Sequence, residues 1–406
     1  MTRTLVLIGH GMVGKRLIEA LRAGEHGNDW RVVALAEEAR PAYDRTLLSS
    51  YLTGGDAERS ALLTPSVPDD PAVRLMLGTP AVRVKPGRRV VHAAGGERVG
   101  YDALVFATGA RPFVPPVPGH DRPGCFAYRT LDDAERVRRA ARPGRPAVVV
   151  GGGVLGLEAA AALRALGMRV HLVERSDRLM AAQLDAAAAR VLAAFVAGLG
   201  VRVHHATTVA SVDGGPGGAV RGVTFAGGAT LPAGLIVFAA GVRPRDELAT
   251  AAGLTVAPRG GIAVDDRCRT ADPHIWAIGD CAAVHGRCYG LVNPGYRMAE
   301  VVAAQLLGRG GKTFTGSDAS VRLKVMGADV ASFGDAHART PGAVEFAQLD
   351  RAAGRYAKLV LAADGRTLLG GILAGDARAY PTLRAMLGRE LTIMPPGLLA
   401  GAASGR

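Results

Sequence analysis

Two short glycine-rich segments have the residue types and spacing that could hold a nucleotide. Residues 9–14 read GHGMVG and residues 151–156 read GGGVLG, so each has glycine at its first, third and sixth positions. Each follows an apolar run and precedes a stretch that predicts a helix. The first glycine permits a tight turn, the second lets the backbone approach a pyrophosphate, and the third lets helix and strand pack closely. The sequence therefore predicts two dinucleotide sites, each with a pyrophosphate at a positive helix N-terminus.

An acidic residue follows each segment at a spacing typical of ribose recognition. Glu37 lies 23 positions after the last glycine of the first segment, and Glu174 lies 18 positions after that of the second. A carboxylate there can accept hydrogen bonds from both ribose hydroxyls, and it would repel a 2′-phosphate. Glu174 therefore favours NADH over NADPH, although Arg175 or Arg178 could instead pair with the phosphate of NADPH.

Two further strand ends distinguish a flavin site from a second nicotinamide site. The apolar run that begins near Tyr101 ends in residues 107–109, ATG, and the run from Ile275 ends in Gly279 and Asp280. An aspartate at such a strand end can accept a hydrogen bond from a hydroxyl of the ribityl chain of FAD. The alternative interpretation of Asp280 is a helix N-cap, because an alanine-rich stretch follows it.

The elements that must position these motifs can be read from the pattern of apolar residues. In each unit we expect strand, glycine turn, helix, strand and acid, in that order. The expected strands are 4–8, 31–36, 147–150 and 169–173, and the expected helices are 15–22 and 157–166. Residues 114–119, VPPVPG, predict a stiff linker.

The predicted fold class is α/β, with two Rossmann-like dinucleotide-binding domains and a small C-terminal α+β domain. The C-terminal domain is expected from strand-like runs at 321–325, 356–361 and 368–373. We place the domains at 1–114 with 242–315 (FAD-binding and discontinuous), 115–241 (NAD(P)H-binding) and 316–406 (C-terminal).

Composition limits the class of protein. The 406 residues are 49% apolar and 21% charged, which is ordinary for globular domains. The formal net charge is +13, but there is no block of like charges or basic tail, so we predict no nucleic-acid partner. The sequence reads as having neither a signal peptide nor a membrane span, and we expect a cytoplasmic protein. The four cysteines form no Cys-x-x-Cys pair, so no metal site is predicted. They are Cys125, Cys268, Cys281 and Cys288.

These motifs together resemble the two-dinucleotide-binding flavoprotein superfamily, which includes glutathione reductase and the ferredoxin and rubredoxin reductases. The resemblance rests on residues 9–14, 107–109 and 151–156, on Leu157 with Glu158, on Ala240 with Gly241, and on Gly279 with Asp280. It implies that the first glycine segment takes FAD and the second takes NAD(P)H.

Three longer stretches carry a more specific resemblance. Residues 37–51 (EEARPAYDRTLLSSY), 291–299 (LVNPGYRMA) and 334–342 (GDAHARTPG) are similar to the N-terminal flavoprotein region of the assimilatory NADH-dependent nitrite reductase large subunit. The same region forms the electron-transfer subunit of some assimilatory nitrate reductases. That nitrite reductase subunit continues into iron–sulfur and siroheme domains, which are absent from this sequence, so we expect no nitrite reduction by this chain alone.

The resemblance implies the following cofactor contacts. For FAD they are Gly9, Gly11, Met12, Val13, Gly14, Glu37, Glu38, Arg45, Val82, Ala107, Thr108, Gly109, Arg129, Gly279, Asp280, Pro294 and Gly295. For NAD they are Gly151, Gly153, Val154, Leu155, Gly156, Glu158, Glu174, Arg175 and Gly241. No catalytic side chain is assigned, since the cofactors carry the chemistry, but Glu158 is expected near the nicotinamide.

The expected function is an FAD-dependent NAD(P)H oxidoreductase that passes electrons from NADH to a separate redox protein. The superfamily's disulfide and peroxide branches need cysteine near residues 40–50, where this chain has Tyr43, Asp44 and Arg45. We expect the acceptor to be an acidic protein or subunit, and a nitrite or nitrate reductase component. The alternatives are a ferredoxin or rubredoxin type of reductase and a non-enzymatic FAD/NADH-binding sensor. The sequence leaves the oligomeric state open.

Overall fold

The computed structural model describes residues 2–54, 70–316, 320–325 and 327–391. The chain divides into two compact units, which are described separately below. The first unit contains Met1–Arg111 and Val242–Ser317, and the second contains Pro112–Gly241 and Asp318–Arg406.

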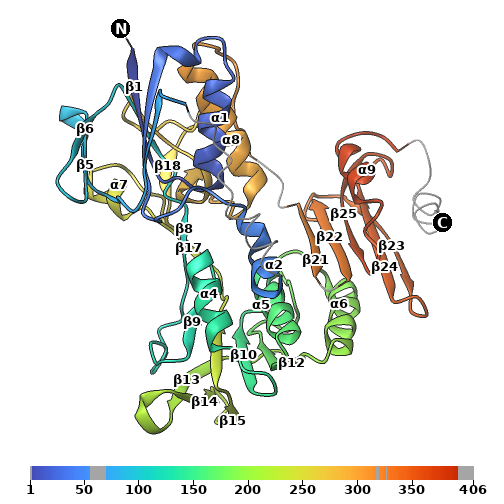
Figure 1. The fold of residues 1–406 in the computed structure, drawn as a ribbon. Helices are drawn as coiled ribbons and strands as arrows, with labels where there is room; N and C mark the ends of the chain where they lie inside the picture. Colours follow the sequence, from blue (N-terminus) through green and yellow to red (C-terminus); the bar gives the residue numbers. More distant parts are fainter. Residues whose placement is uncertain (1, 55–69, 317–319, 326, 392–406) are drawn as a thin grey trace. The chain divides into compact units, whose positions relative to one another are not determined.

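A parallel five-stranded sheet forms the centre of the first unit. Its order is β19 (Ile275–Ala277), β7 (Ala103–Phe106), β1 (Arg3–Ile8), β2 (Trp30–Leu35) and β3 (Val73–Met76). All four residues of β7 are buried, as expected for a parallel strand covered on both faces. Helices α1 (Met12–Arg22) and α8 (Val292–Leu306) are far apart in the sequence but lie side by side (Figure 1). The glycine turn between β1 and α1 therefore lies where N- and C-terminal parts of the chain meet.

Smaller elements complete the first unit. They are α2 (Leu48–Thr53), α7 (Glu247–Ala251), the antiparallel sheet β4 (Ala81–Lys85), β5 (Val90–Ala93) and β6 (Arg98–Gly100), the parallel pair β18 (Ile262–Val264) and β20 (Ala282–Val284), and the pair β8 (Ala110–Pro112) and β17 (Val242–Pro244).

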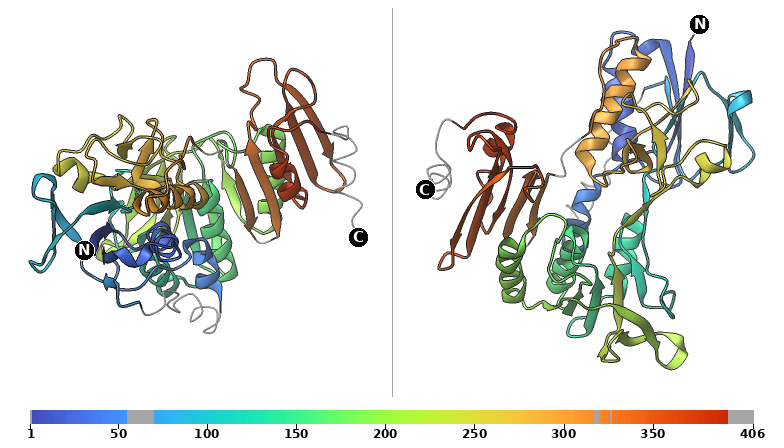
Figure 2. Two further views of the ribbon diagram at one scale, coloured as in Figure 1. Left: turned by 90° about the horizontal axis from the view of Figure 1, so that it is seen from above. Right: turned by 180° about the vertical axis from the view of Figure 1, so that it is seen from behind.

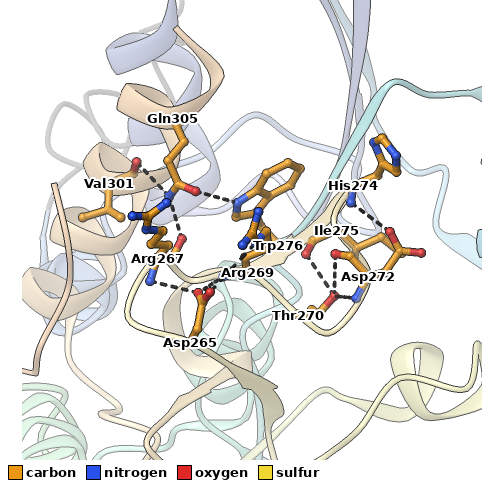
Figure 3. A network of polar contacts seen from close by, with 10 residues as sticks. All are labelled: Asp265, Arg267, Arg269, Thr270, Asp272, His274, Ile275, Trp276, Val301 and Gln305. Atoms are coloured by element: carbon orange, nitrogen blue, oxygen red, sulfur yellow. Dashed lines mark hydrogen bonds and ion pairs between the residues drawn. The ribbon is translucent and has the colours of Figure 1, made fainter. Parts of the chain in front are cut away.

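A polar network holds strand β19 in place beside α8 (Figure 3). The indole nitrogen of Trp276 donates to Gln305 Oε1 at 3.3 Å, and the Gln305 amide donates to the carbonyl of Arg267 at 2.7 Å. On the other side of the strand, Thr270 Oγ1 donates to the carbonyl of Ile275 at 3.0 Å. These bonds fix the strand whose end carries Gly279 and Asp280.

The second unit has an equivalent parallel sheet. Its order is β12 (Arg202–His204), β11 (Arg169–Val173), β10 (Pro146–Val150), β16 (Leu235–Phe238) and β9 (Cys125–Ala127). The accompanying helices are α4 (Leu131–Ala140), α5 (Val154–Ala165) and α6 (Ala186–Gly198). A separate antiparallel sheet contains β13 (Val209–Gly214), β14 (Val220–Phe225) and β15 (Thr230–Pro232).

The C-terminal part of the second unit is a five-stranded antiparallel sheet with the short helix α9 (Tyr380–Ala385) beside it (Figure 2). Its order is β21 (Val321–Val325), β22 (Ala328–Gly334), β25 (Leu368–Ala374), β24 (Arg355–Leu361) and β23 (Val344–Asp350). Helix α6 packs against this sheet, where Lys358 is 3% exposed and its Nζ lies 3.1 Å from Asp185. Asp185 also caps α6, since its Oδ1 accepts from the backbone N–H of Ala188 at 2.9 Å.

The predicted fold class is confirmed, and the differences from the expected elements are local. The predicted helices 15–22 and 157–166 begin too late, because α1 starts at Met12 and α5 at Val154, directly after the middle glycine of each motif. Apolar spacing could not detect those first turns, since the third glycine interrupts the pattern. No helix among the described residues is long and apolar enough to cross a membrane.

Candidate dinucleotide-binding sites

In each unit the chain adds strands first on one side of a central strand and then on the other, and such a switch point is where a crevice forms at the carboxyl ends of parallel strands. In the first unit the switch point lies between β1 and β7, and in the second it lies between β10 and β16. The glycine turns follow β1 and β10, while residues 107–109 and 239–241 follow β7 and β16. Ligands of open α/β sheets bind at this kind of switch point.

The three glycines of the first motif have different surroundings. A β-carbon on Gly9 would overlap the carbonyl oxygen of Ala107, and one on Gly14 would lie 2.5 Å from the carbonyl oxygen of Gly9. A β-carbon on Gly11, by contrast, would meet no atom within 4 Å. The outer glycines are therefore required for packing, and the middle glycine borders open space at the start of α1.

The second motif repeats this arrangement. A β-carbon on Gly151 would overlap the carbonyl oxygen of Ala239, and one on Gly156 would overlap the carbonyl oxygen of Gly151. Again the middle glycine, Gly153, has no atom within 4 Å of that position, and the same is true of Gly241 across the crevice. Both crevices thus leave a backbone surface free for a pyrophosphate at a helix N-terminus, where α5 begins with Val154 and Leu155.

Glu174 lies at the end of β11 and points back to the glycine turn. Its Oε2 accepts from the backbone N–H of Gly152 at 2.6 Å, and its Oε1 accepts from that of Ser176 at 2.7 Å. The guanidinium of Arg178 pairs with Asp177 at 2.8 Å, whereas the Arg175 side chain is exposed. The carboxylate is therefore held in one position, with lone pairs left for ribose hydroxyls.

The two acids of the first unit are arranged differently. Glu37 is 57% exposed and forms an ion pair with Arg245, which lowers the pKa of Glu37. Glu38 is less exposed, accepts a hydrogen bond from Tyr43 at 2.8 Å and pairs with Arg45. The resemblance assigns both acids to the FAD site, and Glu38 also organises the segment that carries Arg45.

That segment is tied to the glycine motif itself. The backbone N–H of Arg45 donates to the sulfur of Met12 at 3.4 Å, and its guanidinium lies 5.6 Å from the ring centre of Tyr43. Arg45 and Met12, both expected to contact FAD, are therefore neighbours in the first unit.

Three segments converge at the N-termini of α1 and α8. A β-carbon on Gly295 would lie 2.6 Å from Val13 and 3.3 Å from the Cα of Gly279. Pro294 lies in the first turn of α8, as its fixed φ allows. The structure thus brings together residues whose positions in the sequence differ widely.

The strand ends that carry residues 107–109 and 279–280 lie on the same edge of the sheet. Thr108 Oγ1 donates to the carbonyl of Arg245 at 2.6 Å, and Gly109 has a φ of +68°. Asp280 lies in the 3-10 turn Gly279–Cys281, which leads into strand β20 rather than an α-helix. The alternative interpretation of Asp280 as the N-cap of an α-helix is therefore wrong.

Cys281 behaves as a buried small side chain. Its thiol is 0% exposed and donates to the carbonyls of Ile278 at 3.3 Å and Phe106 at 3.5 Å, and burial raises the pKa of Cys281. All four cysteines lie in the described part of the chain, and none of them forms a disulfide.

Val82, which the resemblance assigned to FAD, has a side chain that is 59% exposed on β4.

Glu158 lies near the start of α5, on the same edge of the second unit's sheet as Tyr128, which follows β9. Burial raises the pKa of Glu158 from 4.5 to about 7. Tyr128 is 0% exposed, and its hydroxyl has no hydrogen-bond partner among the described residues. Burial and then the charge of Glu158 raise the pKa of Tyr128. The next residue, Arg129, donates its backbone N–H to Asp133 at 3.1 Å, which fixes the chain there.

Two residues of these crevices were missed by sequence reasoning. One is Tyr128, and the other is His10, which is 7% exposed and has both ring nitrogens without partners among the described residues. A signal for His10 was present, because it occupies a variable position inside the first glycine motif. For Tyr128 the only signal in the sequence was that it precedes Arg129, which the resemblance assigned to the FAD site.

Comparison with known families decides which proteins share this arrangement. The family model described as "Pyridine nucleotide-disulphide oxidoreductase" matches residues 3–307. The chain belongs to this family. A second model, "Rubredoxin NAD+ reductase C-terminal domain", matches residues 320–391. The chain is thus an NAD(P)H-dependent flavin oxidoreductase of the pyridine nucleotide-disulphide oxidoreductase family, related to nitrite reductases and to ferredoxin and rubredoxin reductases.

Individual relatives support the more specific resemblance. The nitrite reductase [NAD(P)H] large subunit of Klebsiella oxytoca is 44% identical over 99% of this chain and 42% of its own length. The assimilatory nitrate reductase electron transfer subunit of Bacillus subtilis is 35% identical over 92% of this chain and 48% of its own. The chain spans less than half the length of these relatives. The ferredoxin reductase for the CYP199A2 system of Rhodopseudomonas palustris has a TM-score of 0.85 and 29% identity, and the match covers 96% of each chain.

Proposed function

We propose that this oxidoreductase binds FAD in its first unit and NADH in its second, and that it passes electrons to a separate redox protein. That protein would be a nitrite or nitrate reductase component. A bound flavin would supply the chemistry, by accepting hydride from NADH and releasing electrons to the protein acceptor. The side chains described above would bind and orient the two nucleotides.

The observation that carries the proposal is the pair of crevices with an open middle glycine. Gly11 and Gly153 leave room where a pyrophosphate must approach, while the other motif glycines are packed too closely for any side chain. The residues present therefore fit two dinucleotides. Asp280 favours FAD in the first unit, since it lies at a strand end on the same sheet edge and the 3-10 turn keeps it out of an α-helix cap.

The position of Glu174 supports NADH as the donor. Two backbone N–H groups hold its carboxylate beside the second glycine turn, where a fixed negative charge opposes a 2′-phosphate. Arg178 is already paired with Asp177, so it competes weakly for that phosphate. We expect NADH to reduce the flavin faster than NADPH.

The nature of the acceptor is supported by sequence and by the relatives. No cysteine precedes Cys125, so the segment around Tyr43 and Arg45 offers no thiol for disulfide chemistry. One relative is named an electron transfer subunit of an assimilatory nitrate reductase, and another is named a ferredoxin reductase. A net charge of +13 would attract an acidic acceptor and accelerate its association at low ionic strength.

The test is a reconstitution experiment with the 406-residue chain. After FAD loading, NADH should bleach the flavin rapidly and support turnover with an artificial dye, but not with nitrite or nitrate alone. Addition of an acidic ferredoxin-like protein or a reductase subunit should give turnover that falls as salt increases. Failure to bind FAD, or nitrite reduction by this chain alone, would contradict the proposal.

Nucleotide choice is tested separately with Glu174→Gln. The glutamine removes the charge but keeps one carbonyl for a backbone N–H, so the turn is disturbed less than by alanine. We expect weaker use of NADH and relatively better use of NADPH, with Arg175→Ala as the control for the exposed arginine. A preference of the unaltered protein for NADPH would show that an arginine dominates.

A ferredoxin or rubredoxin type of reductase is the second candidate. It is favoured by the match of residues 320–391 to the rubredoxin reductase C-terminal domain and by the ferredoxin reductase structure. Turnover with rubredoxin that exceeds turnover with nitrite reductase components would favour this candidate.

A further inference from the structure

The two Rossmann-like units can be compared residue by residue through equivalent hydrogen bonds. The backbone N–H of Gly9 donates to the carbonyl of Leu35 at 2.8 Å, and that of Gly151 donates to the carbonyl of Val173 at 2.8 Å. In each case the first motif glycine is bonded to the last residue of the neighbouring strand. This common bond fixes the correspondence between the two glycine turns and the two loops that follow the second strands.

By this correspondence, Ala36 takes the place of Glu174, and His10 takes the place of Gly152. In the second unit a side chain at Gly152 would be blocked, because its β-carbon would lie 2.7 Å from Leu179 and 3.0 Å from Glu174 Oε2. In the first unit the residue at the position of Glu174 is Ala36, whose side chain is a single methyl group. By the same correspondence, the Cα–Cβ bond of His10 points to the side on which the second unit holds its carboxylate.

The chemistry of His10 is that of an unused hydrogen-bonding group. The residue is 7% exposed, and neither ring nitrogen has a partner among the described residues. Buried polar groups are nearly always paired, and leaving one unpaired is costly. Burial, and secondarily Lys15, lowers the pKa of His10 to about 4. At neutral pH the ring is uncharged and offers one donor and one acceptor.

We propose that His10 recognises the hydroxyls of the adenosine ribose of the dinucleotide in the first unit, in place of the carboxylate that Glu174 provides in the second. The inference rests on the proposed binding of FAD in that unit. An uncharged group is adequate there because FAD has no phosphorylated counterpart to reject. The carboxylate is needed only in the unit that must distinguish NADH from NADPH. The neighbouring Glu37 is 57% exposed and paired with Arg245, so it is less available for the same hydroxyls.

The test is a double-mutant cycle on FAD affinity, measured by quenching of flavin fluorescence when the apoprotein is titrated. The probes are FAD and a flavin dinucleotide whose adenosine ribose is 2′,3′-dideoxy. His10→Leu keeps the bulk without polar atoms, and His10→Gln keeps one donor and one acceptor. We expect His10→Leu to weaken FAD binding about tenfold or more, and His10→Gln to restore most of it. We also expect His10→Leu to bind both probes equally, whereas the unaltered protein should prefer FAD.

Several outcomes separate this inference from the proposed function. If the unaltered protein binds no FAD, the proposed function fails. If it binds FAD and His10→Leu still discriminates between the two probes, His10 does not contact the ribose and the inference is wrong. If Glu37→Gln rather than His10→Leu abolishes the discrimination, the ribose is recognised by Glu37. An unchanged NADH affinity of the second unit shows that the His10 variants are folded.

Discussion

The raised pKa of Glu158 makes a quantitative prediction about stability. Its carboxyl is buried near the start of α5, and no hydrogen bond or ion pair within the described residues compensates its charge. A folded-state pKa of about 7, against 4.5 in the unfolded chain, means that folding favours the protonated form. The contribution of this group to stability is fully present below pH 4.5 and is lost as the pH rises through about 7.

The magnitude follows from the difference between the two pKa values. At about 1.4 kcal/mol for each pH unit, the penalty above pH 7 is at most about 3.5 kcal/mol. Because Glu158 is partly exposed, solvent screening reduces this value, and we expect about 1–3 kcal/mol. Glu158→Gln removes the charge at nearly constant shape. The variant should therefore have the stability of the unaltered protein near pH 4.5 and be more stable by this amount at pH 8.5.

The assay is amide hydrogen exchange of the apoprotein, followed by mass spectrometry of peptides from α5 and corrected for intrinsic rates. Glu135→Gln is the matched control, because Arg138 and Arg139 lower the pKa of Glu135 to about 2. Glu135 is charged in the folded state at both pH values and at least half charged in the unfolded chain, so the effect of its replacement should depend on pH far less than that of Glu158→Gln, and with the opposite sign. A Glu158→Gln effect that is equal at pH 4.5 and 8.5 would refute the reasoning.

Two further predictions concern packing and a buried ion pair. Gly156→Ala should abolish NADH binding and lower the melting temperature, since its β-carbon would overlap the backbone. Gly153→Ala should leave the melting temperature unchanged, because the unliganded protein has space for one methyl group at that position. It should weaken NADH binding, because the methyl group would occupy space that the pyrophosphate needs. Calorimetric titration with NADH and thermal melting distinguish the two, and equal melting temperatures would contradict the geometry. Lys358→Met should destabilise α6 and the C-terminal sheet by about 3 kcal/mol, because it leaves Asp185 without its cation, 3.1 Å away. The exposed pair of Arg74 and Glu97 is the control, because Arg74→Met should change local stability, measured by hydrogen exchange, by less than about 1 kcal/mol. A similar loss for both variants would show that burial is unimportant here.

The sequence alone determined the parts of this protein that depend on local spacing. The glycines at 9, 11 and 14, placed between an apolar run and a helical stretch, predict a turn between strand and helix. At Gly14 the reason is local, because a β-carbon there would lie 2.5 Å from the carbonyl oxygen of Gly9. The apolar run that follows Tyr101 predicts a buried strand, and all four residues of that strand, 103–106, are buried. The fold class and the two nucleotide crevices follow from these local signals.

The sequence could not determine which side chains meet across the fold. Glu37 pairs with Arg245, which lies 208 positions later in the sequence. Because this ion pair engages its carboxylate, Glu37 is less available to accept hydrogen bonds from a ribose than its spacing suggested. Lys358 reaches Asp185 only because α6 packs against the C-terminal sheet.

His10 and Tyr128 illustrate the same limit for function. Their residue types are common in any sequence, and they become notable only because packing removes water from them while no described residue provides a hydrogen-bond partner. Desolvation is a property of the whole set of neighbours, and most of those neighbours come from distant segments. Local spacing therefore predicts the positions of the two glycine turns, whereas only the tertiary structure shows which polar groups are buried beside other segments.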